Sequence, residues 1–218
     1  GSFYTFTSRL GLDVTGPDIG KARSSAKIET DFGGFSGSNT MLRIRQAYVN
    51  LDWGKSAVLV GITWHPLFGA VLPDVLNLST GSPFQPFNRS PQIRYQYKAN
   101  SRVQLMASVL WQLQYLSSGP KGMSEDYIKN SCIPEMFVGA DFTPADGWLM
   151  GLGAHMISLK PRTSTEWKEQ TFKVNERMTA FSYEAHLKYS GRNYTFAAKT
   201  LMASALDHTA LLGGYGVS

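Results

Sequence analysis

Polar and apolar residues alternate along much of this chain with a period of two. In the segment from Phe3 to Thr15, one set of alternate positions is built mainly from aromatic and aliphatic residues, and the other set carries Arg9 and Asp13. Successive side chains of a β-strand point to opposite faces, so this segment is predicted to be a strand with one apolar and one polar face. The same alternation recurs at 26–32 and 92–98.

Clusters of Gly, Pro, Asn and Asp divide the chain into segments that alternate in this way. We count about ten strands, each joined to the next by a hairpin-type link, with short and long connections in turn. The longest irregular stretches are 66–91, 117–134 and 160–176. This pattern predicts an all-β fold, a transmembrane antiparallel β-barrel with negligible helix, that forms a single domain over residues 1–218.

The barrel hypothesis fixes which side chains face lipid. The apolar residues predicted to face outward are Tyr4, Leu10, Leu12, Ile28, Val58, Val60, Ile62, Val109, Leu152 and Phe181. Aromatic residues such as Trp148 and Tyr194 lie near the predicted short turns, where barrels carry aromatic girdles. The alternative is a soluble β-sandwich, in which the same apolar residues would pack in a core between two sheets.

Composition removes other classes of protein. No run approaches the roughly 18 consecutive apolar residues that a membrane-spanning helix needs. The net charge is +5, but the cations are dispersed singly, which argues against nucleic-acid binding. The single cysteine, Cys132, excludes an intrachain disulfide and is interpreted as a surface or loop thiol. No signal peptide is evident, so an export signal is expected to have been removed.

The sequence indicates neither an enzyme nor a metal or cofactor site. The four histidines, His65, His155, His186 and His208, are isolated from one another in the sequence, and there is no HExxH motif, cysteine pair or GxSxG motif. An outer-membrane hydrolase that uses His155 or His186 stays as an alternative, because geometry and not sequence order defines such a site. Gly151 and Gly153 lie within a strand pattern, where we expect them to make room in a crowded lumen.

Several motifs, taken together, resemble bacterial porins. They are SRLGLDVTGP, IETDF, LRIRQAYVNLDWG and VGITWHPLFG, and the following SPFQPFNRSPQIRYQ is similar to a porin-like family of Gram-negative outer-membrane proteins. This resemblance implies a diffusion channel of about 16 strands in the outer membrane. It also implies contact with lipid and lipopolysaccharide, and association as a homo-oligomer, a trimer in porins, or with other outer-membrane proteins.

The chain also departs from the porin pattern. It begins on what would be the second strand of a porin and ends in the loop-like LLGGYGVS. We therefore expect a piece of a longer barrel that is incomplete at both ends, with a self-contained ten-stranded barrel as the alternative.

Function would then depend on the charges that line the lumen, because a channel selects by its width and its field. The predicted pore-lining residues are Arg9, Lys27, Glu29, Asp31, Arg43, Arg45, His65, Asp74, Arg94 and Arg102. The resemblance places Arg9 and Arg45 in the arginine wall of porins. Asp74 lies in the stretch 66–91, which is expected to fold into the pore. In the alternative, this stretch is an external loop.

These charges lead to a hypothesis on transport. We expect passive diffusion of small hydrophilic solutes, with anions or zwitterions favoured over cations. In one alternative the acidic residues neutralise the arginines. In another the barrel is a non-conducting structural or interaction subunit of a larger outer-membrane complex.

Overall fold

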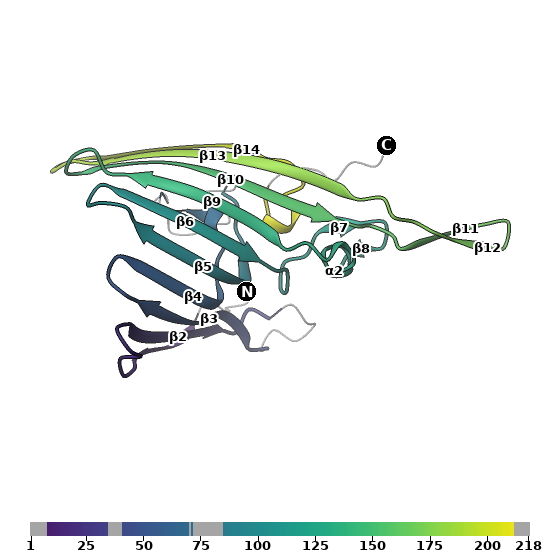
Figure 1. Ribbon diagram of the computed structural model, residues 1–218, viewed down its shortest axis with the longest axis horizontal. Coiled ribbons are helices and arrows are strands. Elements are labelled where there is room, and N and C mark those ends of the chain that lie inside the picture. Colours follow the sequence, from purple (N-terminus) through teal and green to yellow (C-terminus); the bar gives the residue numbers. More distant parts are fainter. Residues whose placement is uncertain (1–7, 35–40, 70, 72–84, 212–218) are drawn as a thin grey trace, which may run out of the picture.

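The computed structural model describes residues 8–34, 41–69, 71 and 85–211, and the fold within them is one large antiparallel sheet (Figure 1). Its strands are β1 (Arg9–Thr15), β2 (Arg23–Asp31), β3 (Arg43–Asp52), β4 (Ser56–Trp64), β5 (Arg89–Lys98), β6 (Val103–Leu110), β9 (Glu135–Phe142), β10 (Trp148–Leu159), β13 (Met178–Ser190) and β14 (Thr195–Met202). The order β1-β2-β3-β4-β5-β6-β9-β10-β13-β14 follows the chain, and every pair of neighbours is antiparallel. The predicted meander of ten strands is confirmed.

The sheet curves and twists from β2 to β14, and it is open within the described part of the chain (Figure 1). Right-handed twist between neighbouring strands is the normal state of a sheet and bends a long meander towards a barrel. The two edges are β1 and β14. Among the described residues, no helix is both long and apolar enough to cross a membrane.

The apolar residues predicted to face outward lie on one exposed side of this sheet. The side chain of Leu152 is 67% exposed and that of Phe181 is 54% exposed. Leu10, Leu12, Ile28, Val60 and Val109 are also exposed, Val58 and Ile62 are partly buried, and Tyr4 lies outside the described residues. Since these side chains do not pack into a core between two sheets, the sandwich alternative is wrong for the part of the chain described.

The other side, here called the inner face, carries the polar residues and most of the buried contacts. On β10, His155, Ile157 and Leu159 are buried, and they alternate with more exposed residues such as Leu152. One apolar cluster joins Tyr127 and Ile128 to Ile157, Leu159 and Ala180, and a second joins Leu67, Leu110, Phe137 and Leu206. These clusters pack three short helices against the inner face: η1 (Pro66–Phe68), α2 (Asp126–Ser131) and η2 (Asp207–Thr209).

The irregular stretches contain local structure that alternation does not predict. Two hairpins, β7 (Ser118–Gly119) with β8 (Gly122–Met123) and β11 (Ser164–Trp167) with β12 (Gln170–Lys173), lie outside the main sheet. The β11–β12 hairpin extends beyond the sheet in Figure 1. Cys132 follows α2 and is exposed, as predicted for a surface thiol.

The sixth strand ends earlier than its sequence pattern predicts. Alternation suggested a strand to about residue 116, but β6 ends at Leu110. The Gln112 side chain accepts a hydrogen bond from the Ser117 backbone N–H (2.9 Å) and donates one to the Ser117 Oγ (2.8 Å). These two bonds close a local loop, which turns the chain away from the sheet.

Candidate functional site

A cluster of charged residues occupies the inner face of β1, β2 and β3. Asp31 Oδ2 accepts from Arg43 Nη2 (2.6 Å) and from Arg45 Nη1 (2.7 Å). Glu29 Oε1 accepts from Arg45 Nε (2.6 Å), and Arg9 Nη1 lies 3.9 Å from the same oxygen. Arg9, Glu29 and Arg45, all predicted to line the pore, therefore meet across three successive strands. Three arginines share two carboxylates here, so the cluster keeps an excess positive charge.

A β-bulge aims Arg45 into this cluster. Glu29 is paired with Gln46 and Thr30 with Ile44, so Arg45 is the extra residue in β3 and has no partner of its own in the ladder. A bulge locally redirects side chains, which here leaves Arg45 6% exposed and between two carboxylates.

The remaining predicted inward residues lie in different settings. Lys27 donates to Asp13 Oδ1 (3.0 Å) across β1 and β2. Arg102 has the parity of an inward residue, but it lies exposed in the turn before β6, where the Asn100 side chain accepts from its backbone N–H (2.8 Å). Asp74 lies outside the described residues.

Two further arginines on β5 have no acidic partner among the described residues. Arg94, predicted to line the pore, donates to the Trp64 carbonyl (2.6 Å) and to Gln92 Oε1 (3.0 Å). Arg89, which the sequence analysis missed, is buried with its guanidinium carbon 5.2 Å from the centre of the Trp64 ring and 5.7 Å from that of Phe87. Such cation–π contacts partly compensate a buried guanidinium. The only sequence signal was the aromatic residue two positions before Arg89.

A cavity of about 250 Å³ opens on the inner face between β4 and β13. Its lining includes His65, Arg94, Asp141, Glu184 and His186. On one wall, His186 Nε2 lies 3.2 Å from Asp141 Oδ1, and His186 Nδ1 lies 3.4 Å from Glu184 Oε2. The cavity therefore has the Arg94 cation on β5 and a histidine between two carboxylates on β9 and β13.

Glycines on β10 make the space that these side chains fill. A Cβ on Gly151 would lie 2.3 Å from the His186 ring, and one on Gly153 would lie 2.6 Å from the Phe137 ring. The expectation that these two glycines make room on a crowded inner face is confirmed.

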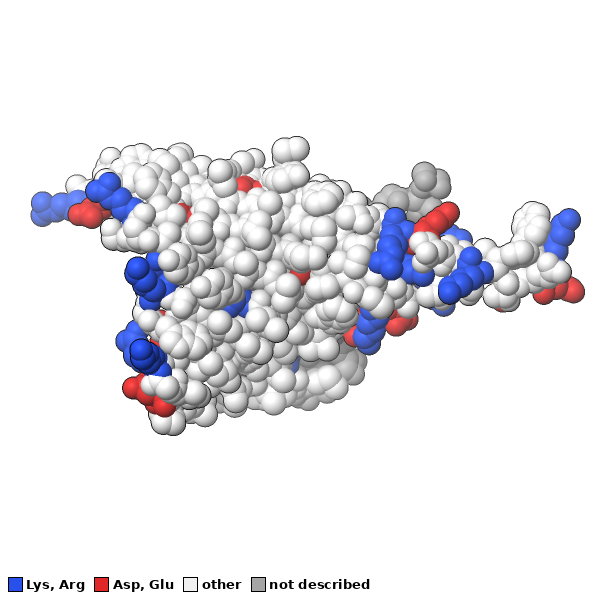
Figure 2. All heavy atoms as spheres, viewed as in Figure 1, with Lys and Arg blue, Asp and Glu red and all other residues white. Residues whose placement is uncertain are grey.

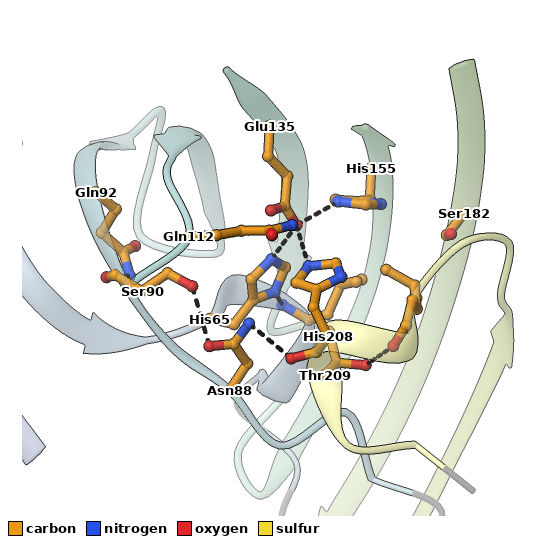
Figure 3. A network of polar contacts seen from close by, with 12 residues as sticks. His65, Asn88, Ser90, Gln92, Gln112, Glu135, His155, Ser182, His208 and Thr209 are labelled. Atoms are coloured by element: carbon orange, nitrogen blue, oxygen red, sulfur yellow. Dashed lines mark hydrogen bonds and ion pairs between the residues drawn. The ribbon is translucent and has the colours of Figure 1, made fainter. Parts of the chain in front are cut away.

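The main feature that sequence reasoning missed is a buried histidine cluster around Glu135 (Figure 3). Glu135 Oε1 lies 2.7 Å from His65 Nε2, 2.7 Å from His155 Nε2 and 3.1 Å from His208 Nε2. All four side chains are fully buried. The histidines are isolated from one another in the sequence, but three of them meet in space at Glu135.

The four residues come from separate elements. His65 caps η1, Glu135 opens β9, His155 lies on β10 and His208 belongs to η2. The alternation does place His65, Glu135 and His155 on the inner face. It does not show that they lie at the same height along their strands, which depends on the strand register. His208 follows the last strand and had no signal at all.

Hydrogen bonds define the state of His65. Its Nδ1 accepts from the Leu67 backbone N–H (3.1 Å), so Nε2 carries the proton that is donated to Glu135. Burial lowers the pKa of His65 to about 4, against the opposing effect of Glu135. For His208 burial also lowers the pKa, but the Glu135 and Asp207 carboxylates outweigh it, and the net pKa is raised.

Further polar contacts hold η2 against the sheet (Figure 3). Asn88 Nδ2 donates to the His208 carbonyl (3.2 Å), and Ser90 Oγ donates to Asn88 Oδ1 (3.0 Å). The Phe87 backbone N–H donates to the Thr209 carbonyl (2.6 Å). Three buried atoms of the cluster have no hydrogen-bond partner among the described residues: Glu135 Oε2, His155 Nδ1 and His208 Nδ1.

The arrangement around His155 does not resemble a nucleophile–base pair. Ser182 lies opposite His155 in the β10–β13 register, but its Oγ donates to the Ser204 carbonyl (3.2 Å). The Nε2 of His155 is directed to Glu135.

Comparison with known proteins shows a likeness at the level of the fold. No family model matches the chain, and no curated protein matches it in sequence. A solved structure of a loop L8 deletion mutant of OmpT, an outer membrane protein of Vibrio cholerae, superposes with a TM-score of 0.56 at 14% identity. The match covers 89% of this chain and 60% of the mutant chain, so it spans less than two thirds of the length of that structure. The likeness supports the predicted antiparallel outer-membrane barrel fold.

Proposed function

We propose that this chain belongs to a porin-type channel of the outer membrane, which allows passive diffusion of small hydrophilic solutes. One observation carries this proposal. The face seen in Figure 2 has a broad band with few charged atoms, and Lys, Arg, Asp and Glu gather at its two ends. A band poor in charge between charged rims, on a sheet with exposed apolar side chains such as Leu152 and Phe181, is the surface that a barrel presents to lipid.

The inner face supports a lumen that favours anions. The cluster of Arg9, Arg43 and Arg45 exceeds its two carboxylates by one charge, and the arginines at 89 and 94 have no ion-pair partner among the described residues. Neutralisation of the arginines, the alternative stated above, is incomplete within the cluster of Arg9, Arg43 and Arg45, which contains only two carboxylates.

A second candidate function is a non-conducting structural or interaction barrel. A specific observation favours it: Leu67 in η1 and Leu206, just before η2, pack with Leu110 and Phe137 on the inner face. These contacts fill part of the space that a channel would need to leave open. Contacts with lipid and lipopolysaccharide, or with other copies of this chain, are expected under both functions.

Single-channel recording separates the two functions. The full-length protein, folded in detergent and added to a planar lipid bilayer, is expected to give stepwise conductance. Persistent silence from correctly folded protein would favour the structural role. We propose no enzymatic activity, and turnover of lipid or peptide that is lost in His155→Gln would contradict this.

A further inference from the structure

We propose that Glu135, His155, His208 and His65 form a binding site for one divalent transition-metal ion, with Zn²⁺ as the best-suited ion. The site does not depend on whether the barrel conducts. The convergence of the four side chains, their charge and their positions in the fold support this site.

The convergence matches a ligand set. Three imidazole Nε2 atoms surround one point, the Glu135 Oε1, at 2.7, 2.7 and 3.1 Å. The donor atoms of His65, Glu135 and His155 all lie within 4.8 Å of one another, and His208, which is not in this group, would join as the fourth ligand through its contact with Glu135. Zinc binds imidazole nitrogen at about 2.0–2.1 Å and carboxylate oxygen at about 2.0–2.2 Å, usually with four ligands. An ion placed near this point requires the nitrogens to move by about 1 Å or less, together with a rotation of the carboxylate.

The charge of the cluster also points to a cation. Glu135 is fully buried, and in the described chain its ion-pair partners are histidines alone, without lysine or arginine. Buried charges in proteins are paired or bind metal ions. The unpartnered Glu135 Oε2 supplies a free oxygen for an ion. A proton on one of the histidines would also neutralise Glu135, so protons compete with zinc for this site. We therefore expect zinc binding to weaken as the pH falls.

The ligands belong to four elements that zinc would join. An ion held by His65 and His208 on one side and by Glu135 and His155 on the other would fasten η1 and η2 to β9 and β10. Four protein ligands and full burial are typical of a structural zinc site, not of a catalytic one. His65 also lines the 250 Å³ cavity, which provides a route to the site.

The four ligands are not equivalent. If zinc binds His65 through Nε2, the proton of the neutral ring must lie on Nδ1. In the structure Nδ1 instead accepts a hydrogen bond from the Leu67 backbone N–H. Binding through His65 therefore breaks a backbone hydrogen bond, whereas Nδ1 of His155 and Nδ1 of His208 have no partner to lose. We expect loss of His65 to weaken binding less than loss of His155 or His208.

The test is a zinc titration of the full-length protein without a polyhistidine tag, after treatment with a chelator. We expect one Zn²⁺ per chain by mass spectrometry of bound metal, and a zinc-dependent rise in the unfolding temperature. Glu135→Gln and His155→Gln are each expected to lower zinc affinity by at least about 100-fold. Loss of a residue that only hydrogen-bonds to a metal ligand typically lowers affinity by about 10- to 100-fold, so the larger loss identifies direct ligands. His186→Gln is the matched control, because His186 is also buried beside carboxylates on the inner face.

A measurement on the wild-type protein tests the proposal even if the variants fail to fold. Co²⁺ added to the chelated wild-type protein is expected to give the intense visible absorption of a four-coordinate site. The proposal is overturned if wild-type protein takes up no stoichiometric zinc and Co²⁺ gives only the weak spectrum of the hydrated ion. It is equally overturned if folded Glu135→Gln and His155→Gln bind zinc as tightly as the His186→Gln control.

Discussion

At the scale of single residues, the sequence predicts which face of a strand a side chain occupies, but it does not predict which other side chains it meets. Alternation assigned residues such as Arg9 and Arg45 to one face, because parity along a strand is a local property. It could not show that Glu135 meets His65 and His155, because these contacts depend on strand register and on chain segments 20 and 70 residues apart. Arg89 was missed for a similar reason: its aromatic surroundings form only in the folded protein.

Gly151 tests the crowding of the inner face. A Cβ there would lie 2.3 Å from the His186 ring, so Gly151→Ala is expected to lower the free energy of unfolding by about 1–3 kcal/mol, the usual effect of overpacking. Gly11→Ala is the control, because its Cβ would meet only the Ile28 carbonyl at an ordinary 3.7 Å. Denaturant titration in detergent measures both. Equal stabilities of the two variants would contradict the proposed packing.

The arginine cluster determines the predicted selectivity. Changing Arg9 and Arg45 together to Gln leaves Glu29 and Asp31 with Arg43, so the local charge changes from a positive to a negative excess. The reversal potential in a salt gradient is expected to shift towards cations, and the shift should shrink at high salt because of screening. Arg23→Gln is the control, since Arg23 pairs with Asp52 and its side chain is 74% exposed. An unchanged reversal potential in the double variant would mean that the arginines act only as internal salt-bridge partners.

At the scale of elements, strands were predictable and the segments between them were not. A strand such as β5 shows its alternation in the sequence from Gln92 to Lys98, where polar and apolar residues take turns. The early end of β6 depends on the side chain of Gln112, and α2 is held by the packing of Tyr127 on Ile157, which no local pattern encodes. The helices η1 and η2 belong to the same class, and they position two ligands of the proposed zinc site.

The outward face of β10 provides a direct test of lipid contact. Leu152 on β10 and Trp167 on the projecting β11–β12 hairpin are both 67% exposed. In lipid, Leu152→Arg is expected to cost about 2–4 kcal/mol near the bilayer midplane, whereas Trp167→Arg outside the bilayer should have little effect. Unfolding titrations in lipid vesicles measure the difference. Similar small effects for both variants would show that β10 does not face the bilayer interior.

At the scale of the whole molecule, the sequence predicted a sheet with an apolar outer side and a polar inner side, and the structure has this arrangement. The register of β1 with β2 places Leu12 beside Ile28 on the outer side and Gly11 beside Glu29 on the inner side. The sequence could not show that η1, η2 and α2 pack on the inner face, because these contacts join segments far apart in the chain. This packing makes the openness of the lumen the central question.

The conductance of the full-length protein in a planar bilayer answers this question most directly. We predict stepwise channel openings in symmetric potassium chloride, and a reversal potential in a salt gradient that indicates preference for chloride. Repeated insertion of folded protein without any conductance would contradict the channel account and leave the structural barrel as the function.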